Sequence, residues 1–249
     1  FLLLLAFVHS LPQQKEWKHS HRTGQSHTRG GKATGMGHRF AGRNVYAGII
    51  STDPKMARIM GRDFHKVPQG VDGTAANNAN KRLEHAHDMT SQLPFPVDTW
   101  WSVYTQNCPN RKTKGNDRGV MMAHYQIWQA WDYQTRQQQL SGDTSTHKDD
   151  VLIIFEDDAN IAVNNVTASL HTELQNMGDT DMLFLGWCYG RRGIPMCLHA
   201  YAMSRKAVSA FTSRWDSCSN EAIDGQLKIL ANEPDLFTWK KASESSYVS

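Results

Sequence analysis

The segment that most constrains the fold covers residues 151–158, with the sequence Val-Leu-Ile-Ile-Phe-Glu-Asp-Asp. Its first five residues are all apolar and mostly β-branched or aromatic, which is typical of a strand buried on both faces of a parallel sheet. Ligands of open α/β sheets bind at the carboxyl ends of the strands, where the three carboxylates of this segment would lie. The segment therefore predicts an α/β fold with an acidic cluster at one edge of its sheet.

Three adjacent carboxylates repel one another, and a bound cation would relieve that repulsion. Carboxylate oxygens suit Mg²⁺ or Mn²⁺, above all when substrate phosphates complete the coordination. An equally open interpretation is that Glu156, Asp157 and Asp158 cap a helix or lie in a loop. Asp149 and Asp150 precede the strand, and eight residues of extended chain at ~3.3 Å each would put about 26 Å between Asp150 and Asp158, which is too far to share one ion. We assign this earlier pair to a solvated turn.

Strands and helices alternate along the rest of the chain. Apolar runs predict short strands at residues 45–50 and 182–185, and helical spacing of apolar residues predicts a helix at residues 120–140. Four further helices are predicted, one after Asp53-Pro54, one capped by Asn164 or Asn165 and stopped by Gly178, one capped by Ser204, and one carrying Ile223, Leu227 and Leu230. Residues 74–80 and 107–117 are predicted to be loops. The alternation predicts one α/β domain at residues 44–240, followed by a tail at 241–249.

The net charge of +3 conceals two unlike parts of the 249-residue chain. Residues 1–43 carry seven basic groups and one acidic group, a net +6, which leaves the body at −3. Residues 11–43 are rich in Gly, His, Ser and Arg and are predicted to form a flexible basic stem. A mildly acidic body does not provide the basic surface that nucleic-acid binding requires, so we expect no nucleic-acid partner.

The chain opens with the apolar run Phe-Leu-Leu-Leu-Leu-Ala-Phe-Val, which is shorter than the about 20 residues that cross a bilayer. Residues 1–10 are predicted to be what remains of a secretory signal or a membrane anchor, because Val8 and Ser10 fit a small-residue cleavage pattern. The alternative is a buried strand, which Pro12 and the glycine-rich tract after it disfavour. We therefore expect a protein of the secretory pathway, anchored in the ER or Golgi membrane by its N-terminus, or secreted.

The four cysteines are too widely spaced for a zinc motif. In an oxidising lumen they can form up to two disulfides, and Cys188 with Cys197, which flank a Gly-Arg-Arg-Gly turn, is the first candidate pair. Four buried thiols are the alternative. Asn165-Val-Thr is a glycosylation sequon, which has meaning only if the protein is luminal.

Five segments, in order along the chain, resemble motifs of one enzyme family. They are Val67-Pro-Gln-Gly-Val-Asp72-Gly73, Arg118-Gly-Val-Met-Met-Ala-His124-Tyr-Gln-Ile-Trp128, Phe155-Glu-Asp-Asp158, His199-Ala-Tyr201-Ala-Met-Ser204-Arg-Lys-Ala207 and Ile223-Asp224-Gly-Gln-Leu227. Over about residues 44–230 this ordered set is similar to glycosyltransferase family 25, which includes bacterial lipooligosaccharide galactosyltransferases and the procollagen galactosyltransferases. Two positions differ from the family pattern: Ile50-Ser51 stands where Asn-Leu is usual, and Ala123 stands where a Ser precedes the helix His.

The resemblance implies a GT-A-like (Rossmann-like) nucleotide-sugar transferase domain. It implies an inverting transfer of a hexose, galactose or glucose, from a UDP-sugar to a hydroxyl of a glycan or protein acceptor. Asp158, with Glu156 or Asp157, would hold Mn²⁺ (or Mg²⁺) on the donor diphosphate, and Asp157 and Asp158 are our first candidates for the metal ligands. Asp224 is the candidate base for the acceptor hydroxyl. The candidate donor-binding residues are Arg58, Asp72, His124, Glu156, Asp157, His199 and Tyr201.

Each of these assignments has a structural alternative. His124 lies on the same helical stripe as Trp128 and is as well explained as a hydrogen-bonded core histidine. Asp224 is equally well explained as a surface residue, and His199 and Tyr201 as packing residues. Trp187 can stack on a sugar or fill the core. For the whole chain, the alternative is a catalytically inactive GT-A domain that binds a glycan or a protein partner, a role for which Ala123 and Ile50-Ser51 leave room.

Overall fold

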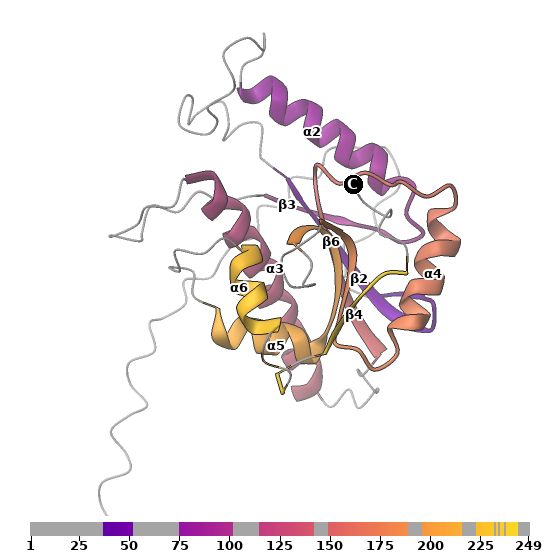
Figure 1. Ribbon diagram of the computed structural model, residues 1–249, viewed down its shortest axis with the longest axis vertical. Helices are drawn as coiled ribbons and strands as arrows, with labels where there is room; N and C mark the ends of the chain where they lie inside the picture. Colours follow the sequence, from indigo (N-terminus) through magenta and orange to yellow (C-terminus); the bar gives the residue numbers. More distant parts are fainter. Residues whose placement is uncertain are drawn as a thin grey trace, which may run out of the picture. The chain divides into compact units, whose positions relative to one another are not determined.

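The computed structural model (Figure 1) describes residues 37–51, 75–101, 115–141, 149–188, 196–215, 223–231, 233, 235–236 and 238–243. All of them belong to the second of two compact units of the chain, Gly35–Ser249. In chain order the elements are β1 (His38–Phe40), β2 (Arg43–Ser51), α2 (Ala75–Thr90), β3 (Asp98–Trp101), α3 (Gly115–Leu140), β4 (Asp150–Glu156), α4 (Val166–Met177), β5 (Met182–Cys188), β6 (Met196–Ser204), α5 (Arg205–Arg214), α6 (Ile223–Ala231) and β7 (Trp239–Lys241).

The strands form one mixed, seven-stranded sheet in the order β1-β2-β4-β6-β5-β7, and β3 also pairs with β2. β4 runs parallel to β2 and antiparallel to β6. The predicted α/β class is therefore confirmed, and the arrangement is compatible with a Rossmann-like fold. The prediction that residues 151–155 lie in a parallel sheet holds on one side of β4 only. All five of these residues are buried, as predicted.

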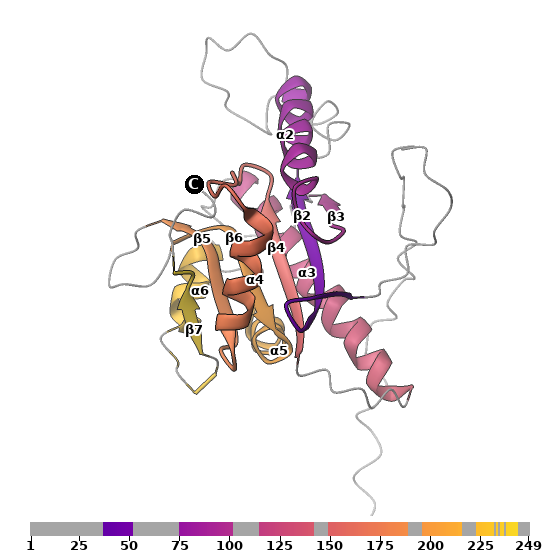
Figure 2. The same ribbon diagram turned by 90° about the vertical axis from the view of Figure 1, so that its right-hand side faces the viewer.

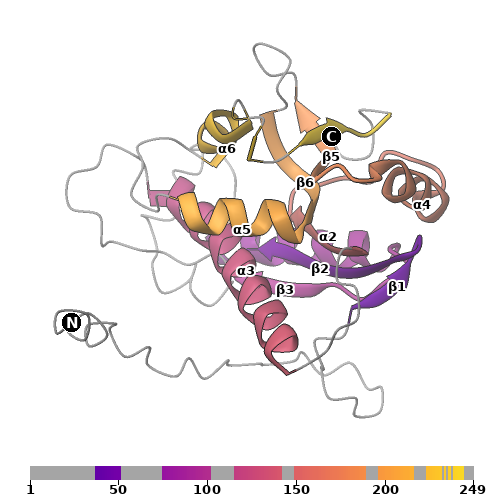
Figure 3. The same ribbon diagram turned by 90° about the horizontal axis from the view of Figure 1, so that it is seen from below.

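Helices cover both faces of the sheet (Figures 1 and 2). One face packs against α3, α5 and α6 through a core that includes Trp128, Ile154 and Phe211. The other face packs against α2 and α4 through a second core that includes Met89 and Leu174. Seen from below, α3 and α5 lie side by side (Figure 3), and the rings of Trp128 and Phe211 meet edge to face at 5.0 Å. Successive residues of β4 alternate between the two cores, which decides where the carboxylates at its end point.

The predicted helix caps are confirmed. The Asn165 side chain accepts a hydrogen bond from the backbone N–H of Ala168 at the start of α4, and Gly178 ends this helix with a φ of 53°. Ser204 caps α5 in the same way, through the N–H of Ala207. The predicted helix after Asp53-Pro54 lies outside the described residues.

The loop predicted at residues 74–80 is wrong, because α2 begins at Ala75. Its Asn-rich first turns have weak helix propensity, but its later residues Ala86 and Met89 are buried in the second core, and this packing stabilises the helix. Similarly, α3 begins at Gly115, inside the loop predicted at residues 107–117.

The sheet extends into both the predicted stem at residues 11–43 and the predicted tail at residues 241–249. β1 lies within residues 11–43, and a two-residue turn with positive φ at Ala41 and Gly42 pairs it with β2. At the other end, β7 ends at Lys241, one residue beyond the predicted domain limit. The predicted signal or anchor at residues 1–10 lies outside the described residues. Within the described residues, we find no helix with the length and apolar character needed to cross a membrane.

The solvated turn predicted for the residues before β4 is wrong for Asp150. This residue is 1% exposed, and its carboxylate accepts hydrogen bonds from the Asn44 amide (2.8 Å) and from Arg205 at the start of α5 (Nε, 3.0 Å). Arg205 is far away in the sequence, so no local pattern reveals this partner. Of the four cysteines, Cys108 and Cys218 lie outside the described residues, as do the side chains of Cys188 and Cys197, so the predicted pair stays a prediction.

Asp181 joins three elements at the edge of the sheet, and its pKa predicts a pH-dependent stability. Burial alone would raise the pKa of Asp181, but hydrogen bonds from the Thr238 backbone N–H (2.9 Å), Lys206 (3.0 Å) and Ser204 (3.0 Å) lower it below its ordinary value of 3.8. A carboxylate with a lowered folded-state pKa stabilises the fold above its unfolded pKa, and this contribution is lost as the pH falls through the folded value.

We therefore expect Asp181→Asn to reduce the free energy of unfolding by about 1–3 kcal/mol at pH 7 and by progressively less below pH ~4. Urea unfolding of both proteins at several pH values measures this difference. Asp179→Asn is the control, because it removes the same charge from an exposed position two residues away. An equal loss at pH 7 and pH 3 would contradict the assignment.

Candidate metal centre

The acidic segment Glu156-Asp157-Asp158 divides between the two faces of the sheet. β4 ends at Glu156, which follows the alternation of Leu152 and Ile154 and points toward the α3 side. Asp157 follows Ile153 and Phe155 and points toward the α2 side. Asp158 lies in the turn after them, with a side chain that is 51% exposed. These three carboxylates are therefore adjacent in the sequence but do not form a single site.

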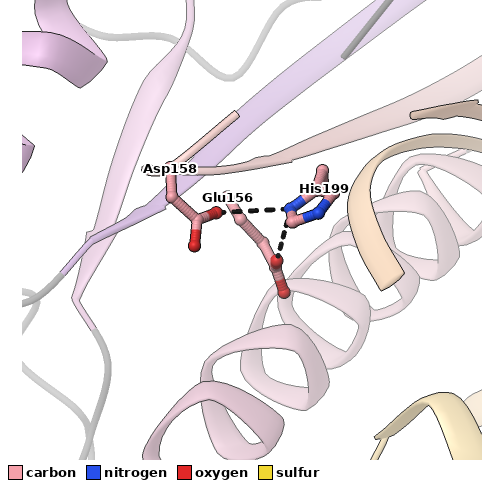
Figure 4. A group of neighbouring side chains, drawn as sticks. All are labelled: Glu156, Asp158 and His199. Atoms are coloured by element: carbon pink, nitrogen blue, oxygen red, sulfur yellow. Dashed lines mark ion pairs between the residues drawn. The ribbon is translucent and has the colours of Figure 1, made fainter. Parts of the chain in front are cut away.

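A histidine from the neighbouring strand completes the cluster around Glu156 and Asp158. Phe155 pairs with Ala200 across β4 and β6, so Glu156 and His199 follow opposite each other at this edge of the sheet. The Nδ1 atom of His199 lies 3.5 Å from Oε2 of Glu156 and 3.4 Å from Oδ1 of Asp158 (Figure 4). One ligand atom from each of these residues lies within 4.8 Å of the other two, which is close enough to hold one metal ion.

Asp157, a predicted metal ligand, has other partners. Its Oδ2 accepts a hydrogen bond from Ser51 at the end of β2 (2.8 Å), and its Oδ1 forms a salt bridge with Arg82 of α2. Arg82 also lies 3.3 Å from Oδ2 of Asp158. Asp157 is 3% exposed, so it joins α2 to the ends of β2 and β4 and lies apart from the cluster of Glu156, Asp158 and His199.

The pKa values of the carboxylates follow this division. Burial would raise the pKa of Glu156, but hydrogen bonds with His124 and His199 lower it. The His199 hydrogen bond lowers the pKa of Asp158. Burial raises the pKa of Asp157, and Arg82 and Ser51 offset this only in part. Glu156 and Asp158 are therefore the carboxylates best suited to carry negative charge at the site.

The pKa of His199 is shifted in the opposite direction to those of Glu156 and Asp158. Its contacts with Asp158 and then Glu156 raise the pKa of His199 to about 10, although burial opposes this. A protonated His199 would supply a positive charge between the two carboxylates. A metal bound through Nδ1 would take over this charge and displace the proton.

His124 and Tyr201 are both fully buried, at 0% exposure. Nδ1 of His124 lies 2.6 Å from the Tyr201 hydroxyl, and its Nε2 lies 3.2 Å from Oε1 of Glu156. Burial raises the pKa of Tyr201 well above its ordinary value, so the hydroxyl keeps its proton. His124 is therefore a hydrogen-bonded core histidine, and it also contacts Glu156 of the candidate metal centre.

The remaining predicted residues cannot be placed in the site. Arg58 and Asp72 lie outside the described residues. Asp224 is the second residue of α6 and Trp187 lies in β5, but the structure describes only their backbones. The roles of these four residues stay predictions.

Two features of the site escaped sequence reasoning. Arg82 lies just beyond residues 74–80, whose sequence predicts a loop, and no local pattern points to its pairing with Asp157. His199 was identified as a donor-binding candidate but not as a metal ligand, because the sequence did not indicate that β6 pairs with β4. The alternation of His199 and Tyr201, two residues apart and so on one face of a strand, was the available signal.

The donor atoms fit some metals better than others. Two carboxylate oxygens and one imidazole nitrogen suit Mn²⁺ and other first-row divalent ions. They suit Mg²⁺ less well, because Mg²⁺ prefers oxygen ligands alone. No protein-family model matches this chain, and no curated protein matches it either.

Proposed function

We propose that this protein is a metal-dependent glycosyltransferase with a GT-A-like domain, which transfers a hexose from a UDP-sugar to a hydroxyl of a glycan or protein. The observation that carries the proposal is the cluster of Glu156, Asp158 and His199 at the carboxyl end of β4. Ligands of open α/β sheets bind at this edge, and the five motifs that resemble glycosyltransferase family 25 include all three residues.

The proposed chemistry divides the work among a few groups. A divalent ion, when bound, neutralises charge on the departing nucleotide diphosphate. Glu156, Asp158 and His199 would hold this ion. The Arg82 side chain is 40% exposed beside Asp158 and adds a second positive charge for the phosphates. Arg58 and Asp72 remain candidates for contacts with the nucleotide, and Asp224 remains the candidate base for the acceptor hydroxyl.

Donor binding tests the proposal. We expect UDP-galactose or UDP-glucose, with Mn²⁺, to raise the melting temperature of the full chain. A ligand at about 100 times its Kd adds ~2.7 kcal/mol, and each kcal/mol is worth roughly 2–4 °C for a domain of this size, so the shift should be about 5–11 °C. Differential scanning fluorimetry over a panel of UDP-sugars measures it.

The controls separate the possible outcomes. If the donor binds through the metal, EDTA should abolish the rise in melting temperature. If the protein binds a UDP-sugar but neither hydrolyses it nor transfers the sugar to any acceptor, the result would favour the alternative function, a glycan- or partner-binding GT-A domain. If no nucleotide sugar raises the melting temperature in the presence of Mn²⁺, the proposal is wrong.

A further inference from the structure

A chain of buried hydrogen bonds runs from the core of the α3 face to the candidate metal centre. Trp128 Nε1 lies 3.2 Å from the Tyr201 hydroxyl, which lies 2.6 Å from Nδ1 of His124. Nε2 of the same His124 ring lies 3.2 Å from Oε1 of Glu156. Trp128, His124 and Tyr201 are each at most 1% exposed, so water does not compete for the first two bonds, whereas the bond to Glu156 is partly buried.

The donors and acceptors of these groups indicate a direction for each bond. An indole N–H can only donate, so the Tyr201 oxygen accepts from Trp128. Of the two groups that contact this hydroxyl, only His124 Nδ1 can accept the phenol proton, so the arrangement that satisfies this proton leaves Nδ1 unprotonated. His124 must therefore carry its proton on Nε2, and this N–H donates to Oε1 of Glu156, since an ionised carboxylate can only accept.

The positions of these residues in the fold explain how they meet. His124 and Trp128 are four residues apart on α3, so they lie on one face of the helix. Tyr201 lies on β6 opposite Ile154 of β4, on the strand face that α3 covers. The rings of His124 and Tyr201 stack at 5.7 Å with an interplanar angle of 23°, which limits the rotation of the imidazole.

We propose that Trp128, Tyr201 and His124 form a one-directional hydrogen-bond chain that fixes His124 as its Nε2-protonated tautomer and orients Glu156 so that Oε2, not Oε1, is the metal ligand. His124 is thus a positioning residue that contacts neither metal nor nucleotide. Oε2 is the oxygen that faces His199, at 3.5 Å, while Oε1 is occupied by His124. This role rests on the proposed metal centre, whereas the tautomer of His124 does not.

The tautomer can be measured directly in the wild-type protein. Two-bond ¹H–¹⁵N correlation NMR of the ¹⁵N-labelled full chain distinguishes protonated from unprotonated ring nitrogens, and His124→Gln identifies the resonances of His124 by their loss. We expect a proton on Nε2, the donor to Glu156, and none on Nδ1, the acceptor from Tyr201. A proton on Nδ1, in either a neutral or a charged ring, would overturn the chain.

The positioning role is tested with Mn²⁺ alone, by calorimetry or by the electron paramagnetic resonance of free Mn²⁺. His124→Phe should weaken Mn²⁺ binding ~10–100-fold, the usual effect of losing a hydrogen-bond partner of a metal ligand. His124→Gln retains an N–H donor and should recover part of the affinity. Tyr201→Phe removes only the hydroxyl that selects the tautomer, and it should weaken Mn²⁺ binding less than His124→Phe does.

Met203→Ala is the matched control. Met203 is as buried as Tyr201, on the same strand and the same face, but it has no part in the chain. It should cost stability without changing Mn²⁺ affinity. Equal Mn²⁺ affinity in the wild type and both His124 variants would overturn the positioning role. If the wild type bound no Mn²⁺, the proposed function would fail while the NMR result still decided the tautomer, so the two failures are distinguishable.

Discussion

Asp158→Asn should reduce Mn²⁺-dependent binding of the UDP-sugar donor by more than about 100-fold, since losing even an outer partner of a metal ligand typically costs 10–100-fold. The change keeps the shape of the side chain and removes its charge and one of the two carboxylates near His199. Because the Asp158 side chain is 51% exposed, the loss of its ion pairs with His199 and Arg82 should cost only about 1 kcal/mol of stability or less. Donor and Mn²⁺ titrations by calorimetry measure the loss.

Asp157→Asn is the matched control, since it makes the same chemical change at the adjacent residue. Asp157 is buried, and its carboxylate binds Arg82 and Ser51, so this variant should lose about 1–3 kcal/mol of stability. Its Mn²⁺ affinity should fall far less than that of Asp158→Asn. If the two variants lost metal affinity equally, Asp157 would be a ligand, as the sequence first predicted. If Asp158→Asn bound metal and donor normally, the proposed metal centre would be wrong.

Arg205→Met should destabilise the fold by about 3 kcal/mol or more, the largest effect on stability that we predict. It removes the guanidinium that pairs with Asp150, whose side chain is 0% exposed, and so weakens the compensation of a buried negative charge. Methionine keeps much of the length of the arginine side chain, so the loss of stability reflects mainly the loss of the positive charge. For a domain of this size the melting temperature should fall by roughly 6–12 °C.

Two variants test this explanation. Arg136→Met breaks an exposed ion pair with Asp132 on α3 (2.9 Å), and it should cost about 0.5 kcal/mol or less. Adding Asp150→Asn to Arg205→Met removes the buried charge that Arg205 pairs with and should restore part of the stability. Urea unfolding of the four proteins measures these differences. A loss from Arg205→Met as small as that from Arg136→Met would refute the account.

The parts of the fold that the sequence predicted correctly depend on local signals. The apolar residues of β4, the caps Asn165 and Ser204, and the stop at Gly178 are each determined by a few neighbouring residues. The strand β6 was not predicted, because its Ala and Met residues have little intrinsic preference for a strand. Its conformation depends on pairing with β4 on one side and β5 on the other.

The candidate site was predictable to the same extent. Glu156 and Asp158 were identified from the strand that precedes them, which is a local pattern. The separation of Asp157 from them depends on Arg82, 75 residues earlier, and the contribution of His199 depends on the direction of β6. Neither the partner of a buried charge nor the neighbour of a strand is encoded near the residue concerned.

The place of β6 in the sheet has a consequence for how the chain is made. β6 follows β5 in the sequence but lies between β4 and β5. During synthesis, therefore, both of these strands are complete before the strand that joins them leaves the ribosome, and each then has an open edge that can pair with another chain. His199 lies on β6 itself, so the strand that closes these edges also brings the last residue of the proposed metal centre. A chain interrupted before residue 196 would lack the proposed metal centre and be prone to aggregate, and metal binding at that centre would report that the sheet has closed.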